Sequence, residues 1–217
     1  MKFSRRHFLK AAGAGGPGAV AMTTVGAGVA GIVGLEETAA AQTASPPALL
    51  AIPAPITGET GTFNVNGRTH RVEFEARTTL WEVLAVKLPY VGVNRACNRG
   101  TCGACSVLVD GVPTYSCHTL ATEGVGKRIF TVEGLGDEKN LHALQQVGYR
   151  YMAADCGYCT AGWQTSAKAL LDKNQHPTED DVKTALAGHI CRCNAYPNII
   201  RTIIDTAKVL RGDAEIV

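Results

Sequence analysis

The chain has 217 residues, a formal net charge of +2, 46% hydrophobic residues, 18% charged residues and eight cysteines. This length suits one or two small domains that can build a core without disulfide staples. Residues 1–41 carry four basic and two acidic residues, so the remaining 176 residues hold 17 of each. This balance argues against a nucleic-acid partner.

The first 41 residues are organised like a twin-arginine export signal. Arg5 and Arg6 precede an uncharged, glycine-rich stretch over 11–35, and three alanines at 39–41 offer a cleavage site. We therefore expect export by the twin-arginine translocase, removal of residues 1–41 and a periplasmic protein. The alternative is a retained anchor, because 25 uncharged residues could cross a bilayer. The glycine content and the cleavage site favour removal.

Residues 42–60 are rich in Ala, Pro and Thr. This composition is typical of an extended linker. The alternative is an arm that lies across a partner subunit.

The predicted globular part opens with a β-hairpin and a helix. Apolar and polar side chains alternate over 63–74 around Asn66-Gly67, a pair typical of type I′ turns. A capping box at Thr79 opens a helix with one apolar face, and Pro89 ends it.

Four cysteines follow with the plant-type ferredoxin spacing C-x4-C-x2-C and a distant fourth cysteine. They are Cys97, Cys102, Cys105 and Cys117. Four thiolates can hold one [2Fe–2S] cluster, and the first three of these lie in one tight loop. Gly100 and Gly103 allow positive φ and a close approach of the backbone to the inorganic sulfides, so we expect both to contact the cofactor.

Short strands complete this half of the chain. Residues 106–109 and 112–116 flank a tight Asp-Gly turn, and 127–132 form a further strand. Together with the hairpin and the helix, they predict an N-terminal β-grasp, plant-type ferredoxin-like domain over 61–135.

The pattern from residue 136 onward is helical. Apolar residues at helical spacing predict four helices, over 141–148, 160–173, 178–190 and 197–209. The remaining cysteines have the spacing C-x2-C-x31-C-x1-C and are Cys156, Cys159, Cys191 and Cys193. They precede the second and fourth helices, whose N-terminal dipoles favour an anionic thiolate cluster. We therefore predict an α+β protein in which 136–217 form an all-α four-helix domain around a second [2Fe–2S] cluster.

Three other uses of the cysteines compete with this interpretation. A disulfide framework suits the even count, but only one residue separates Cys191 from Cys193. Zinc sites contain C-x2-C pairs, yet the other spacings match them poorly. A Rieske centre needs two His ligands, and His118 and His189 lie near cysteines, but each block already offers four thiolates. The spacings favour two all-cysteine clusters.

Both cysteine blocks match the pattern of a known family. The chain resembles the small iron–sulfur subunit of molybdenum hydroxylases, the xanthine dehydrogenase and aldehyde oxidoreductase family. The resemblance covers about residues 60–212 and rests on three runs: Cys97-Asn-Arg-Gly-Thr-Cys-Gly-Ala-Cys105, Cys156-Gly-Tyr-Cys159 and Cys191-Arg-Cys193. The export signal makes the chain most similar to periplasmic aldehyde oxidoreductase subunits.

The resemblance implies a division of labour. A separate large subunit would hold the molybdopterin cofactor and oxidise an aldehyde, and no residue of this chain would be catalytic. Two electrons would pass to the second cysteine block, then to the first, and then to an FAD-binding or cytochrome c subunit. Asp155 and Cys193 would contact the pterin. Any association with a membrane would come through a partner.

The chain departs from the family pattern near the second block. Asp155 stands where the family usually has Gln, and an ionised carboxylate only accepts hydrogen bonds, whereas an amide also donates. Ala161 and Ala195 replace a usual Pro and Gly, but neither is a ligand. Arg192, between two ligands, would neutralise the cluster or a cofactor phosphate, or form a salt bridge.

Other functions remain open. The complex could be an isoquinoline- or xanthine-type hydroxylase, or the chain could be a free-standing periplasmic carrier with two clusters. A lone ferredoxin needs only the first cysteine block, so the second domain favours a subunit of a larger enzyme.

Overall fold

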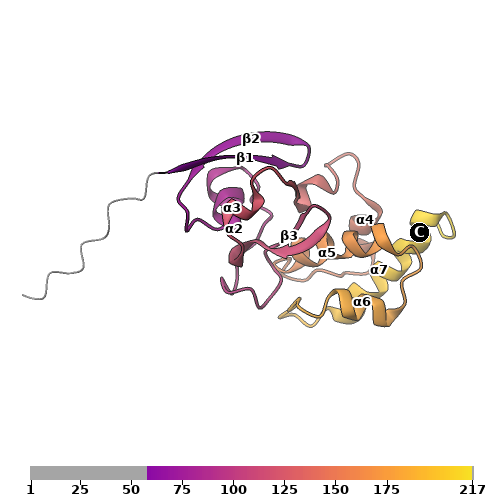
Figure 1. The fold of residues 1–217 in the computed structure, drawn as a ribbon. Helices are drawn as coiled ribbons and strands as arrows, with labels where there is room; N and C mark the ends of the chain where they lie inside the picture. The colour runs from indigo at the N-terminus through magenta and orange to yellow at the C-terminus, as the bar shows by residue number, and fades with distance from the viewer. Residues whose placement is uncertain (1–57, 217) are drawn as a thin grey trace, which may run out of the picture. The chain divides into compact units, whose positions relative to one another are not determined.

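The computed structural model of the protein describes residues 58–216 (Figure 1). The predicted export signal and most of the predicted linker lie outside these residues. The linker prediction is wrong for its last two residues, because strand β1 (Glu59–Val65) already begins at Glu59. Over the described part, no helix is both long enough and apolar enough to cross a membrane.

The strands form one mixed sheet, as the sequence predicts. Its order is β2-β1-β5-β3-β4, with β2 (Arg68–Phe74), β3 (Ser106–Val109), β4 (Val112–Tyr115) and β5 (Arg128–Phe130). β1 and β5 are parallel, and the other neighbours are antiparallel. The predicted strand over 127–132 is shorter than expected, because a 3-10 turn, η3 (Val132–Gly134), follows it.

The predicted hairpin turn is confirmed. Asn66 and Gly67 both have positive φ, 51° and 78°, as a type I′ turn requires. The turn sets the register in which Val65 lies opposite Arg68. This register directs Phe63 and Phe74 into the core, where their rings pack edge to face with centroids 5.6 Å apart.

A short helix packs against the sheet, as predicted, but it changes type after its first turn. α2 (Leu80–Glu82) starts at the capping box, where the N–H of Thr79 donates to the Glu82 carboxylate at 2.7 Å. The next turn, η1 (Val83–Lys87), is a π-helix. Leu88 is extended (φ −118°, ψ 163°), as expected of a residue before proline, and the helix ends there. Its fully buried side chains are Leu80, Val83 and Leu84.

The C-terminal half contains α4 (Ala143–Arg150), α5 (Thr160–Lys173), α6 (Glu179–Ala185) and α7 (Tyr196–Arg211). α5 has the predicted bounds, and α7 carries Pro197 in its first turn, where proline's missing N–H costs nothing. These helices share a second core that includes Leu144, Trp163, Val182 and Ile203. Figure 1 shows α5 lying beside β3, so the two halves of the chain are in contact.

The third helix differs from its prediction. It ends at Ala185 rather than at Ile190, and the chain turns over the last residues. The backbone N–H of Ile190 donates to the carbonyl oxygen of Cys102 at 3.0 Å and is therefore unavailable for a helical bond. The apolar spacing that suggested a longer helix gives no sign of this long-range contact.

Two further short segments, η2 (Ser116–His118) and α3 (Ala121–Gly124), connect β4 to β5. η2 matters for the site because it contains Cys117, which is buried.

Candidate functional site

The first four cysteines gather around the loop before β3. The thiol of Cys97 contacts that of Cys102, and the thiol of Cys105 contacts that of Cys117. The backbone N–H of Thr101 points at the Cys97 sulfur from 3.4 Å. This is the kind of N–H···S contact that stabilises a bound iron–sulfur cluster.

The two glycines expected in this loop have the predicted conformation. Gly100 and Gly103 have φ of 70° and 71°. A Cβ on Gly100 would lie 3.2 Å from the Cβ of His118, and one on Gly103 would lie 2.7 Å from the ring of His189. Both positions therefore favour glycine for backbone conformation, and Gly103 requires it for space as well.

The protonation of these thiols differs with their surroundings. Hydrogen bonds from the Thr101 side chain, and then from backbone N–H groups and Cys102, lower the pKa of Cys97 to about 5. Burial, followed by the neighbouring Cys117 thiol, raises the pKa of Cys105 to about 12. Cys97 is thus ready to bind iron as a thiolate at neutral pH, whereas Cys105 must lose a proton when iron binds.

The second four cysteines gather where α5 and α7 begin. The thiol of Cys156 contacts that of Cys193, and the thiol of Cys159 contacts that of Cys191. Cys159 is the N-cap residue of α5. The N–H of Ala195, the N-cap residue of α7, points at the Cys191 sulfur from 3.5 Å. Both helix N-termini therefore lie beside this group, as the sequence predicts.

Two of these thiols are open to solvent. Cys156 and Cys193 are exposed, whereas Cys191 is buried and Cys159 is half-buried. A hydrogen bond from the N–H of Tyr158, and then the contact with Cys193, lower the pKa of Cys156. Burial, followed by the contact with Cys191, raises the pKa of Cys159 to about 12.

All eight cysteines are free thiols and lie in the described part of the chain. Across residues 58–216, no three His, Cys, Asp or Glu side chains gather in the arrangement of a site for one metal ion. The thiols approach one another instead as pairs, two pairs in each group. Each iron of a [2Fe–2S] cluster takes two protein ligands, so paired thiols, glycine at the crowded positions and N–H groups aimed at sulfur fit this cofactor.

Asp155, a predicted pterin contact, is exposed beside the open thiol pair. Its charge acts on both Cys156 and Cys193, which places the three side chains at one edge of the second group. Arg192 is exposed between Cys191 and Cys193, and His118 is exposed with its ring against Gly100.

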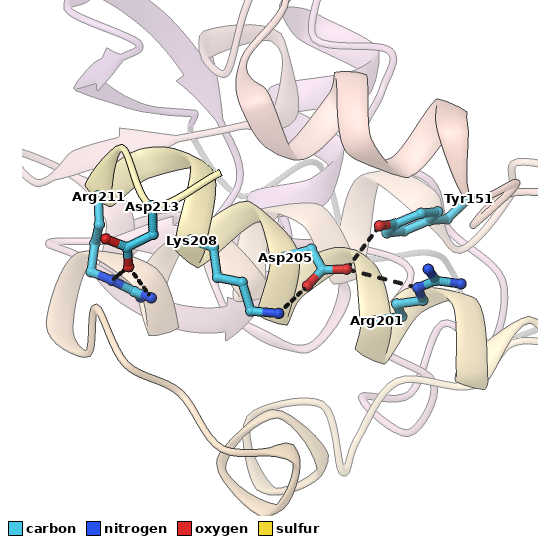
Figure 2. Close-up of polar contacts among 6 residues, drawn as sticks. All are labelled: Tyr151, Arg201, Asp205, Lys208, Arg211 and Asp213. Atoms are coloured by element: carbon cyan, nitrogen blue, oxygen red, sulfur yellow. Dashed lines mark hydrogen bonds and ion pairs between the residues drawn. The ribbon is translucent and has the colours of Figure 1, made fainter. Parts of the chain in front are cut away.

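The segment that leads into this edge is held by a polar cluster (Figure 2). The hydroxyl of Tyr151, the C-cap residue of α4, donates to Asp205 at 2.8 Å. Lys208 and Arg201 flank the same carboxylate at 2.6 and 3.7 Å, and the Arg201 guanidinium stacks 4.2 Å above the Tyr151 ring. This arrangement fixes the end of α4 to α7, four residues before Asp155.

The two cysteine groups are joined by contacts that the sequence did not reveal. Besides the Ile190–Cys102 hydrogen bond, the Tyr158 hydroxyl donates to the Arg95 carbonyl at 2.9 Å. The Arg95 guanidinium lies 3.7 Å above the ring of Trp81, which also packs against the core under the sheet, so Trp81 belongs to both the core and this junction. These partners are far apart in the chain, so no local pattern could predict them.

A close backbone approach completes the junction. A Cβ on Gly162 of α5 would overlap the carbonyl oxygen of Gly103. Helix α5, whose N-cap residue is Cys159, therefore rests directly on the loop that carries the first group.

Comparisons with known proteins agree with this geometry. Residues 63–128 match the family described as "2Fe-2S iron-sulfur cluster binding domain", and residues 131–204 match "[2Fe-2S] binding domain".

Individual relatives cover most of the described part. The chain is 43% identical over 141 residues to the nicotine 6-hydroxylase small subunit of Paenarthrobacter nicotinovorans, covering 65% of this chain and 85% of that one. It is 37% identical to the aldehyde oxidoreductase iron-sulfur-binding subunit PaoA of Escherichia coli K12, covering 70% and 72%. The structure of the aldehyde oxidoreductase from Desulfovibrio desulfuricans superposes with a TM-score of 0.70 at 37% identity, covering 73% of this chain and 18% of that chain.

Proposed function

The chain belongs to the family of small iron–sulfur subunits of molybdenum hydroxylases, and from this premise we propose that it relays electrons from a molybdopterin-binding large subunit to an acceptor subunit. The observation that carries the proposal is that the chain has two groups of paired thiols. The backbone hydrogen bond from Ile190 to Cys102 joins the segments that carry them. An electron carrier of this kind has no catalytic residue of its own.

We assign one [2Fe–2S] cluster to each thiol group. Cys97, Cys102, Cys105 and Cys117 would hold the first, in a ferredoxin-type domain over 61–135. Cys156, Cys159, Cys191 and Cys193 would hold the second, in a four-helix domain over 136–217. When bound, such a cluster takes up and releases a single electron.

The exposed edge of the second group is the proposed entry point for electrons. Cys156 and Cys193 are exposed there, and Asp155 lies beside them. We propose that this edge faces the molybdopterin subunit, with Cys193 against the pterin and the Asp155 carboxylate accepting a hydrogen bond from the pterin amino group. Electrons would leave from the first group to an FAD-binding or cytochrome c subunit.

The proposed substrate of the complex is an aldehyde. The likeness to the aldehyde oxidoreductase subunit and the predicted export signal around Arg5-Arg6 support this choice. A second candidate is an N-heterocycle, because the identity to the nicotine 6-hydroxylase small subunit is higher, 43% against 37%. We propose a periplasmic location for the complex, reached by twin-arginine export of this subunit and removal of residues 1–41.

The experiment is purification of the native protein with its partners. We expect equal iron and acid-labile sulfide, two distinct paramagnetic signals on graded reduction, and a molybdenum-containing large subunit that oxidises aldehydes. Faster turnover of N-heterocycles would favour the second candidate. A monomer with both signals and no molybdenum partner would identify a free-standing carrier, and a colourless, iron-free protein would refute the electron-transfer role.

A further inference from the structure

His189 occupies the junction between the two thiol groups. Its side chain is only 9% exposed. Its Nε2 atom lies 3.1 Å from the Ser106 hydroxyl and 3.1 Å from the Ser166 hydroxyl. One ring nitrogen thus meets a residue from each half of the chain.

Both serines belong to segments that carry proposed ligands. Ser106 directly follows Cys105 and is the first residue of β3. Ser166 lies in α5, the helix whose N-cap residue is Cys159. His189 itself is two residues before Cys191. A single side chain therefore connects three segments on which both clusters would depend.

The hydrogen-bond directions can be assigned. The Ser106 hydroxyl donates its one hydrogen to the Gly103 carbonyl at 2.7 Å, so it can only accept from His189. In this arrangement Nε2 carries a hydrogen, and the Ser106 and Ser166 hydroxyl oxygens share it as acceptors. The resulting series of bonds runs from the Cys191 turn, through His189 and Ser106, into the loop of the first thiol group.

The surrounding atoms leave the ring little freedom. A Cβ on Gly103 would lie 2.7 Å from the His189 ring, and a Cβ on Gly188 would overlap the Tyr115 hydroxyl. The Tyr115 ring packs edge to face against the imidazole at 6.3 Å. The turn that contains His189 is the same turn whose Ile190 N–H reaches Cys102. Holding the imidazole in place thus also holds this direct contact between the groups.

We propose that His189 is a positioning residue that fixes the separation and orientation of the two clusters, and thereby the rate at which an electron passes between them. This inference rests on the proposed electron-transfer function. Electronic coupling falls steeply with distance, so a side chain that holds the junction closed controls this rate without binding iron.

The test compares His189→Leu, which removes the donor, with His189→Gln, which places an N–H at a similar reach. The matched control is His176→Leu, because His176 is exposed and its backbone N–H donates to the Asn174 side chain rather than to a junction residue. Each variant is prepared as the full complex, and three properties are measured: iron content, the magnetic interaction between the two reduced clusters, and the rate of electron transfer between them.

We expect His189→Leu to keep its iron and both signals, to show a weaker magnetic interaction, and to transfer electrons severalfold more slowly. His189→Gln should restore both properties, and His176→Leu should match the wild type. Wild-type interaction and rate in His189→Leu would overturn the inference. If His189→Leu loses its iron, the Ser106→Ala and Ser166→Ala double variant decides, because unchanged interaction and rate there would equally overturn it. Absence of two signals in the wild type would refute the proposed function instead.

Discussion

The backbone N–H of Ile190 donates to the carbonyl oxygen of Cys102 at 3.0 Å. One partner is the residue next to Cys191 and the other belongs to the first thiol group, so this bond connects the two groups directly. The bond lies in the turn that follows the early end of α6 and reaches across to the cysteine loop. The packing that brings these segments together can be tested one contact at a time.

The contact of Gly162 with Gly103 should tolerate no side chain. Gly162→Ala would push a methyl group into the Gly103 carbonyl, and we expect a loss of about 1–3 kcal/mol in the free energy of unfolding, as for other overpacked sites. Urea unfolding measures the loss. The matched control is Gly148→Ala in α4, where the new Cβ would meet Thr202 and Trp163 at an ordinary 3.6 Å. There the better helix propensity of alanine should be neutral or stabilise by about 0.5–1 kcal/mol.

A ligand substitution in one thiol group should remove the cluster of that group and leave the other cluster in place. Cys97→Ser should abolish one paramagnetic signal and about half of the iron, and Cys191→Ser should abolish the other signal with a similar loss. Each variant serves as the control for the other. Loss of the same signal in both variants would contradict the assignment of one cluster to each group.

The polar cluster around Asp205 should stabilise the fold in a pH-dependent way. Burial alone would raise the pKa of Asp205, but hydrogen bonds from Lys208 and Tyr151 and the nearby positive charges outweigh it and lower that pKa. Because the folded pKa is below that of the unfolded chain, this stabilisation is complete above about pH 4 and is lost as the pH falls through the folded value.

Asp205→Asn should therefore lower the free energy of unfolding by about 1 kcal/mol at pH 7, with a smaller difference from wild type below about pH 4. Urea unfolding at several pH values measures both effects. Asp213→Asn is the control, because its pair with Arg211 is more exposed (55% for Asp213), and it should change stability by less than about 0.5 kcal/mol. An equal effect of Asp205→Asn at all pH values would contradict this account.

Export should depend on the two adjacent arginines. Replacing Arg5 and Arg6 together by lysine keeps the charge but removes the twin-arginine signature. We expect the subunit to accumulate in the cytoplasm with its clusters inserted, as measured by cell fractionation and iron content. Unchanged export of the double variant would rule out this route.

The sequence predicts those parts of the site that depend on local chemistry. Short-range rules predict the grouping of nearby cysteines, the positive φ at Gly103, the Asn66-Gly67 turn and the start of α5 beside Cys159. The structure agrees with each of them. The mixed sheet and the succession of helices follow in the same way from hydrophobic periodicity.

The rest depends on contacts between distant segments. The early end of α6, the hydrogen bonds of His189 to two serines, and the stacking of Arg95 on Trp81 arise only when the two halves of the chain meet. The predicted helix over 178–190 is wrong for this reason, since Leu186 and Ile190 have the right spacing but different partners. Local periodicity cannot distinguish a helix from a turn that is held by a remote carbonyl.

The uneven covering of the second thiol group has a consequence for the lifetime of the subunit. Cys156 and Cys193 face water, whereas Cys191 beside them is buried. Oxidants and chelators would therefore attack this centre from its outer rim and reach the inner sulfurs last. A large subunit bound at that rim would protect the cluster as well as supply its electrons. A small subunit without this partner should therefore lose the cluster of the second group, and its visible absorption, first.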